Sequence, residues 1–238
     1  IFFVRFIFPV KYSMSNPTST NINYKNTTLS FLIKAFQVKT PNIKSTPRAI
    51  QYVSEWINLN AKGRKVITIT LREYQRAPNR NSSLKDWASF VRSLDRKIFF
   101  PIILRDTEKD FQLLPKELEG VKIFHQPVWN IELRSALYQL SYLNLLKDNG
   151  VGVFCILNPR VNYLFFHSMI GSSIEYWNSQ GLLTGKSYPW SGRCQKVIWE
   201  RDRYEVIKRE FELMCRKIEK YGSNNNQIKK SNYVYEKN

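Results

Sequence analysis

Two short apolar runs, VITITL at residues 66–71 and FFPIIL at residues 99–104, constrain the fold of this chain most strongly. Each run is apolar at nearly every position, and the first is rich in β-branched residues. This pattern is typical of a parallel strand that is covered on both faces, because a half-exposed antiparallel strand would alternate apolar and polar residues. Both runs are therefore predicted to be buried strands of a parallel sheet.

Helical signals precede and separate these runs. Thr46 and Pro47 form an N-cap and first-turn pair, and the apolar spacing after them predicts a helix that Gly63 ends. Ser83, with Asp86 three residues later, resembles a capping box with a shorter acid and is predicted to open a second helix. The buried face of that second helix is expected to consist of Trp87, Phe90, Val91 and Leu94.

The rest of the chain is expected to continue this alternation. Further strands are predicted at residues 121–124, 151–157 and 163–166, and helices at residues 131–146, 172–178 and 202–221. The helix over residues 131–146 is expected to stop at Asp148-Asn149-Gly150, which is typical of a left-handed helix cap. Strands that alternate with helices predict an α/β fold with a Rossmann-like, mainly parallel sheet flanked by helices.

Composition divides the chain into three parts. Residues 1–45 are rich in Ser, Thr, Asn and Lys, and they are predicted to be a basic polar arm or the remnant of a missing upstream domain, since the chain begins at Ile1 without a methionine. Residues 46–221 are predicted to form the α/β domain, and residues 222–238 a disordered polar tail. The apolar opening of ten residues contains Arg5 and is too short to span a bilayer.

The chain is strongly basic, with 37 Lys and Arg against 19 Asp and Glu, or a formal net charge of +18. An anionic partner such as nucleic acid, a membrane surface or a phosphorylated small molecule would suit that charge. Most of the excess lies outside the middle of the chain, since residues 66–215 hold 21 basic against 16 acidic side chains. Compositional drift and a selected polyanion-binding surface both remain open.

Several kinds of site are not indicated. Three cysteines without CxxC spacing argue against a disulfide framework and a zinc site, and a reducing compartment fits them best. His125 and His167 have no partner at triad spacing, Asp106-x-Glu108 is a weak metal signal, and no P-loop or dinucleotide fingerprint is present. We therefore expect no metal ion and no cofactor.

The candidate binding residues follow the predicted strands, because ligands of open α/β sheets bind beyond the carboxyl ends of the strands. After residues 66–71 come Arg72, Arg80, Asn81 and Ser82, at the start of a predicted helix whose free N–H groups favour an anion. Arginine grips phosphate through two parallel hydrogen bonds. The alternative is that these arginines lie on a solvated loop or pair with the acidic side chains Glu73 and Asp106.

Three further residues complete the candidate set. Asp106 follows residues 99–104, and its carboxylate could accept hydrogen bonds from a ribose or sugar hydroxyl. Asn149 and Gly150 form either a helix cap or a ligand contact, since glycine allows close approach and asparagine both donates and accepts. Four aromatic residues either pack or stack on a base or sugar, namely Trp129, Tyr188, Trp190 and Trp199.

Three stretches together resemble a family: VITITLREYQRAPNRNSSLKDW, FPIILRDTE and SYLNLLKDNGVGVFCIL, within residues 64–215. They look like a group of bacterial proteins associated with surface-polysaccharide synthesis and related to GT-B glycosyltransferases. The resemblance implies a Rossmann-like domain that binds a nucleotide-diphosphate sugar, with Arg72 at the diphosphate, Arg80, Asn81 and Ser82 beside it, and Asn149 and Gly150 near the donor.

The resemblance also implies a metal-independent transferase with a carbohydrate acceptor, in the cytoplasm, with peripheral association at the inner face of the membrane left open. The competing hypothesis is a basic nucleic-acid-binding α/β protein without catalytic activity, which the net charge and the many aromatic residues favour.

Overall fold

The structure is a computed structural model that describes residues 43–169, 174, 175, 177, 178 and 182–221. The predicted arm, apart from residues 43–45, and the predicted tail over residues 222–238 lie outside the described residues, and so does part of the predicted helix over residues 172–178.

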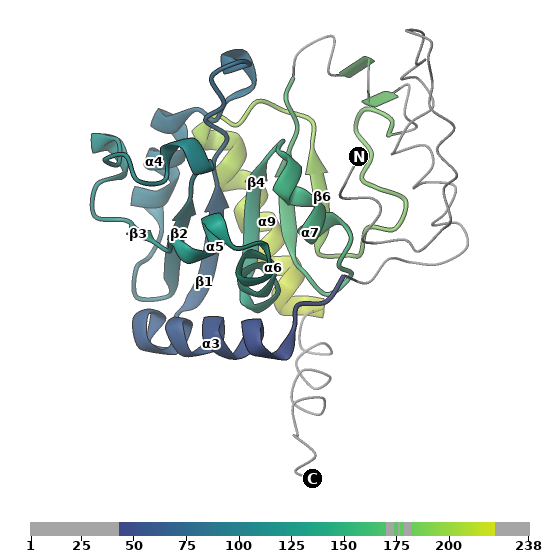
Figure 1. The fold of residues 1–238 in the computed structure, drawn as a ribbon. Coiled ribbons are helices and arrows are strands. Elements are labelled where there is room, and N and C mark those ends of the chain that lie inside the picture. Colours follow the sequence, from purple (N-terminus) through teal and green to yellow (C-terminus); the bar gives the residue numbers. More distant parts are fainter. Residues whose placement is uncertain (1–42, 170–173, 176, 179–181, 222–238) are drawn as a thin grey trace, which may run out of the picture.

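Within the described residues the core is a single parallel sheet of six strands in the order β3-β2-β1-β4-β5-β6 (Figure 1). Every neighbouring pair is parallel, so the Rossmann-like α/β fold expected from the sequence is confirmed. The strands are β1 (Lys65–Thr70), β2 (Phe99–Leu104), β3 (Lys122–Ile123), β4 (Leu143–Lys147), β5 (Tyr163–Phe166) and β6 (Gln195–Ile198).

Helices cover both faces of this sheet. One face carries α3 (Pro47–Ala61), α5 (Gln126–Trp129), α6 (Ile131–Leu140) and α7 (Val153–Ile156), and the other carries α4 (Leu84–Ser93) and α9 (Tyr204–Tyr221). Short 3-10 turns lie at Pro78–Arg80, Thr107–Lys109, Lys116–Leu118 and Gly150–Gly152. None of the described helices is long and apolar enough to cross a membrane.

The alternation of side chains along β1 builds both cores. Ile67 and Ile69 are fully buried against α4 and α9, whereas Val66 packs in the cluster beneath α3 and α6. The predicted buried face of α4 is confirmed, and its Trp87 is fully buried with its ring edge-on to Phe166 of β5. Helix α3 is confirmed as well, since Thr46 caps it.

The prediction for residues 131–157 is wrong in two places. Helix α6 ends at Leu140, and residues 143–147 form β4 between β1 and β5. The buried polar Asn144 is satisfied there, because its Oδ1 accepts from Thr68 Oγ1 at 2.5 Å. The predicted strand over residues 151–157 is instead the turn Gly150–Gly152 followed by α7, because the side chain of Asn149 accepts from the N–H of Gly152 and starts a helical turn.

The sequence also missed β6, a four-residue strand at the far edge of the sheet. Tyr188 and Trp190 stack on one another in a small hydrophobic cluster that includes Val197 of β6 and Trp199. Tyr188, Trp190 and Trp199 therefore take part in packing, which is one of the two roles that the sequence left open for them.

Candidate functional site

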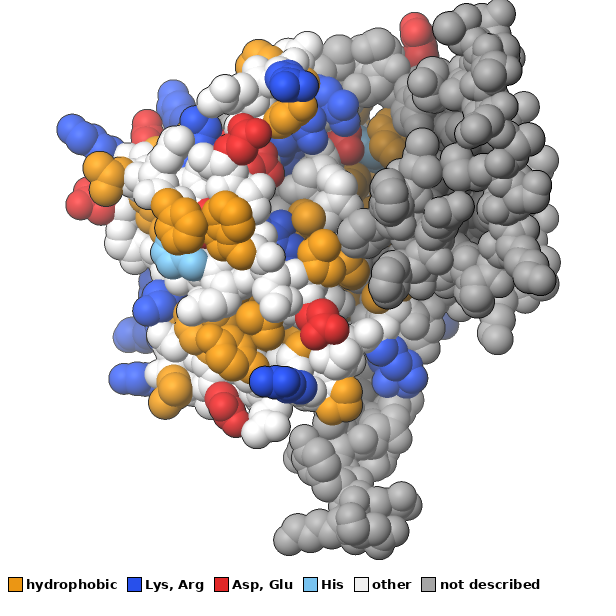
Figure 2. Space-filling view, in the orientation of Figure 1, with side chains coloured by type: hydrophobic (Ala, Val, Ile, Leu, Met, Phe, Trp, Pro, Cys, Tyr) orange, Lys and Arg blue, Asp and Glu red, His pale blue; other side chains and the backbone are white. Residues whose placement is uncertain are grey.

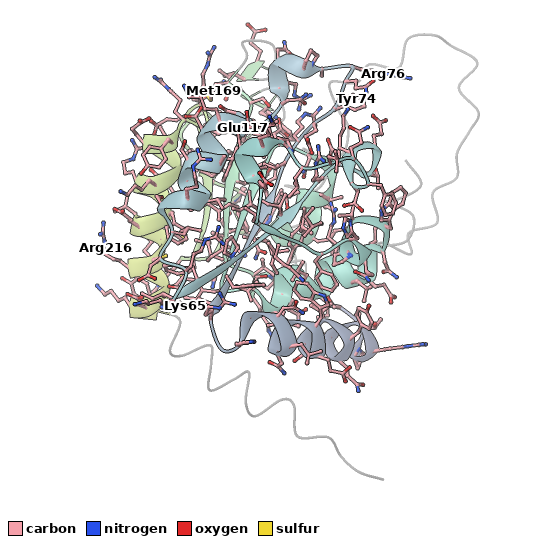
Figure 3. All side chains as sticks on the ribbon, turned by 90° about the vertical axis from the view of Figure 1, so that its left-hand side faces the viewer. Lys65, Tyr74, Arg76, Glu117, Met169 and Arg216 are labelled. Carbon is pink, nitrogen blue, oxygen red and sulfur yellow. The ribbon has the colours of Figure 1, made fainter. Side chains whose placement is uncertain are left out.

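The carboxyl ends of all six strands lie at one edge of the molecule. Tyr74 and Met169, which follow β1 and β5, lie at the same end in Figure 3, opposite Lys65 at the start of β1. Lysine, arginine and acidic side chains mix at that end in the space-filling view (Figure 2). The strand order reverses between β1 and β4, and in open α/β sheets the ligand crevice lies at this switch point.

Arg72 leaves β1 at the switch point and crosses to the end of β4. Its Nη1 donates to the backbone oxygen of Asp148 at 2.9 Å. Its backbone is held by Ser82, whose Oγ accepts from the N–H of Arg72 at 2.9 Å and whose N–H donates to the Arg72 oxygen at 2.9 Å. Ser82 therefore shapes the loop, and the guanidinium of Arg72 bridges β1 and β4.

Arg80 reaches the same aspartate from the other end of the loop. Its Nη2 lies 2.7 Å from Oδ2 of Asp148, a carboxylate that is 7% exposed. Nδ1 of the fully buried His167, after β5, lies 3.8 Å from the same oxygen. Burial raises the pKa of Asp148, but His167 and Arg80 outweigh it and hold that pKa well below its usual range. Asp148 is therefore held as an anion, with Arg80 as its ion-pair partner.

Unpaired nitrogen atoms gather around this aspartate. Buried Nε of Arg72, Nε of Arg80 and Nδ2 of Asn149 have no hydrogen-bond partner within the described structure, and neither have the ring nitrogens of His167 or Oγ of Ser168. Buried polar groups are nearly always paired, so each unpaired group needs an explanation. Donors at the ends of three adjacent strands form a set that an anionic ligand could satisfy.

The remaining predicted site residues have local partners. The side-chain amide of Asn81 exchanges hydrogen bonds with the backbone of Tyr74, which closes the loop after β1. Oδ2 of Asp106 accepts from the N–H of Glu73 at 2.6 Å, and burial raises the pKa of Asp106. A Cβ at Gly150 would meet no atom of the described residues within 4 Å, so no close contact with them requires that glycine.

Neither suggested acid pairs with the arginines at the switch point. Glu73 instead binds Arg105, through Nε to Oε2 at 2.8 Å and Nη2 to Oε1 at 2.5 Å. Both side chains are buried, at 4% and 9% exposed.

A carboxylate of the protein already lies at the amino end of α4, where the sequence predicts a bound anion. Oδ2 of Asp202 already accepts from the N–H of Ser83 at 3.1 Å and from Nε1 of Trp87 at 2.8 Å. Oδ1 of Asp202 binds Nζ of Lys147 at 2.7 Å. Ser83 does not cap the helix through its side chain, and its hydroxyl instead donates to the carboxylate of Asp86. The protein therefore supplies its own carboxylate at this position.

A polar cavity of about 900 Å³ opens between the loop after β1 and the ends of β4, β5 and β6. Two further arginines from the segment after β6, Arg201 and Arg203, reach it. Its described lining is Asn79, Asn81, Ser83, Asp86, Lys147, Ser168, Met169, Arg201, Asp202 and Arg203.

Sequence reasoning missed Lys147, Asp148, His167, Ser168 and Asp202 as members of this edge. Each of these residues ends or follows a strand. Correct bounds for β4 would have placed Lys147 and Asp148 at this edge, and the predicted bounds of β5 already placed His167 there. Among the described residues no group of three or more His, Cys, Asp or Glu side chains could hold a metal ion. The three cysteines are free.

Comparison with known proteins adds one finding. No family model matches the chain, and no curated protein matches it. Among solved structures the chain is similar to "the glycosyl transferase family 9 from Veillonella parvula", with 9% identity and a TM-score of 0.45, over 71% of this chain and 45% of that one. The likeness is one of fold. The chain spans less than half the length of that protein.

Proposed function

We propose that residues 46–221 form the donor-binding domain of a GT-B-type glycosyltransferase, which binds a nucleotide-diphosphate sugar at the carboxyl ends of β1 and β4. The observation that carries the proposal is the set of buried unpaired donors on Arg72, Arg80 and Asn149 at the switch point. A diphosphate offers many acceptor oxygens in a small volume, and guanidinium groups match them in two-point geometry.

Arg80 would exchange partners when the diphosphate binds. Its present partner is Asp148, and a phosphate oxygen would compete with that carboxylate for the guanidinium. His167, 3.8 Å from the same carboxylate oxygen, would then hold the aspartate as an ion pair when protonated. The cavity lined by Lys147 and Ser168, the sequence neighbours of Asp148 and His167, would receive the rest of the donor.

The proposed chemistry is electrostatic. As the bond between sugar and diphosphate breaks, negative charge grows on the leaving group, and Arg72 and Arg80 would stabilise it without covalent attack by the protein. Because the two guanidinium groups supply positive charge, the proposed reaction needs no divalent metal. The acceptor is a carbohydrate, as surface-polysaccharide synthesis would require, and the protein would act in the cytoplasm near the membrane.

Thermal stability in the presence of nucleotides tests this proposal, because a ligand that prefers the folded state raises the melting temperature. We expect one nucleoside diphosphate and its sugar conjugates to stabilise the protein, equally with magnesium and with a chelator. Arg72→Ala should abolish that shift. Arg76→Ala is the matched control, since Arg76 lies exposed in the same loop and points away from the body of the molecule (Figure 3).

Two results would contradict the proposal. One is a nucleotide shift that Arg72→Ala leaves intact while the fold is preserved. The other is the absence of any nucleotide shift together with a salt-sensitive shift caused by RNA or DNA, which would favour nucleic-acid binding.

A further inference from the structure

Three exposed rings lie together on the surface near α5. Phe111 is 77% exposed and Trp129 is 55% exposed, and the side chain of His125 is 45% exposed. The ring of Phe111 is nearly parallel to that of Trp129, at 19° and 5.3 Å between centroids, and to that of His125, at 15° and 5.8 Å. We call these three residues the aromatic platform. Figure 2 shows hydrophobic side chains beside a histidine on this face.

A buried carboxylate holds Trp129 by a hydrogen bond and lies next to His125. Asp110 is 1% exposed, and its Oδ2 accepts from Nε1 of Trp129 at 2.7 Å. Its Oδ1 lies 3.1 Å from Nδ1 of His125. The polar atoms of both rings that contact Asp110 therefore face the protein, and Trp129 still remains 55% exposed.

The loop that carries Phe111 is anchored as well. Nη1 of Arg105 donates to the backbone oxygens of Gln112 at 3.1 Å and Leu113 at 3.3 Å, and the same guanidinium is held by Glu73. Rings that are ordered before a ligand arrives lose little conformational entropy on binding. Contiguous exposed apolar groups that are held in this way are typical of a binding surface.

The charge of the segment that carries Phe111 indicates which kind of ligand would stack on these rings. Residues 107–122 carry Lys109, Lys116 and Lys122, and against them stand Glu108, Glu117 and Glu119 together with Asp110 beneath the platform. This segment, which carries Phe111, lacks the excess of positive charge that a nucleic-acid backbone or an anionic lipid surface would need. A neutral ligand suits it. The flat face of a pyranose ring, lined with weakly positive C–H groups, complements the negative face of an aromatic ring.

We propose that the aromatic platform binds a neutral carbohydrate chain by stacking on one of its pyranose rings. The platform follows β2 and β3, whereas the unpaired donors follow β1, β4 and β5, so both lie on the carboxyl side of the same parallel sheet. The carbohydrate is the acceptor of the transfer, a role that rests on the function proposed above, whereas the stacking itself does not.

Titration of the full chain with neutral oligosaccharides tests the proposal directly. The probes are hexasaccharides of α-glucose, β-glucose and mannose, and the readout is the NMR signal of the Trp129 indole N–H, assigned by its loss in Trp129→Phe. We expect at least one probe to shift this signal in a saturable way. Phe111→Ala, at an exposed position, should weaken the binding about tenfold.

Leu113→Ala is the matched control, because Leu113 is 95% exposed and apolar but has no ring. Its affinity should equal that of the unchanged protein. An equal loss in Leu113→Ala and Phe111→Ala would overturn the proposal in favour of a general apolar docking face. A platform signal that none of the hexasaccharides shifts would overturn it too, as would a shift caused instead by oligothymidine or by phosphatidylcholine–phosphatidylglycerol vesicles.

Arg72→Ala separates the two proposals. It should lose the nucleotide response and keep the carbohydrate response. If nucleotides fail to bind while an oligosaccharide shifts the Trp129 signal, the donor site is refuted and the platform stands, and the reverse pattern refutes the platform alone.

Discussion

The buried pair between Glu73 and Arg105 gives a prediction whose size follows from its geometry. Glu73→Ala would leave the guanidinium of Arg105 buried without its carboxylate. Two charge-assisted hydrogen bonds disappear, at 2.8 and 2.5 Å, between side chains that are 4% and 9% exposed. Removal of one partner from such a buried pair costs about 3–5 kcal/mol of unfolding free energy. For a domain of this size we expect the melting temperature to fall by roughly 6–20 °C.

The double variant should recover part of that loss. In Glu73→Leu combined with Arg105→Met no buried charge is left unpaired, so its cost should be smaller than the sum of the single costs by about 1–3 kcal/mol. Urea unfolding followed by tryptophan fluorescence measures the unfolding free energies of Glu73→Leu, of Arg105→Met and of the double variant. Glu200→Ala is the control, because the ion pair between Glu200 and Arg209 has side chains that are 51% and 48% exposed and should contribute less than about 1 kcal/mol.

A cost below about 1 kcal/mol for Glu73→Ala would refute this reasoning, because it would place the buried pair among ordinary surface pairs. The reasoning is also refuted if the free-energy costs of the two single substitutions simply add in the double variant. The expected loss comes from a charge that is left without its partner, and the double variant leaves no such charge.

Three other changes follow from single contacts. Gly152→Ala should lower the unfolding free energy by about 1–3 kcal/mol in urea unfolding, because the added Cβ would lie 2.4 Å from Cε2 of Phe165. Asp202→Asn should destabilise the protein at neutral pH and flatten its acid transition. Burial raises the pKa of Asp202, but Lys147 outweighs it and lowers that pKa, so the stability it confers is complete above about pH 4 and is lost as the pH falls towards the folded-state value. Thr46→Ala should lower the melting temperature by removing the N-cap of α3, at a cost of about 1 kcal/mol.

Continuous apolar runs made the first half of the sheet predictable from sequence. β2 has the predicted bounds, and β1 is shifted by one residue, because each run is nearly all apolar and is buried on both faces. β4 was not predictable in this way, since Asn144 and Lys147 interrupt it. Both are buried polar residues whose partners, Thr68 and Asp202, lie 76 and 55 residues away in the chain.

The candidate site, like the sheet, was predictable from the sequence only in part. Arg72 and Arg80 stood out because arginine after a strand at a sheet edge suits an anion, and whether they bind one stays a prediction. Their contacts with Asp148 could not be predicted, because the sequence placed that residue at the end of a helix and the structure places it at the end of β4. Distant partners decide which polar groups are paired, and short-range patterns do not report them.

The position of β1 at the centre of the sheet affects how the chain reaches its fold. β1 pairs on one side with β2 and on the other with β4, whose paired residues begin 76 positions later, at Leu143 opposite Ile67. Until β4 docks, one side of β1 is an open edge whose residues are buried from Val66 to Thr70 in the native sheet. Pairings over such long sequence separations form slowly. An intermediate that lacks β4 would therefore expose a β-branched edge for a relatively long time, and aggregation during refolding should begin at that strand.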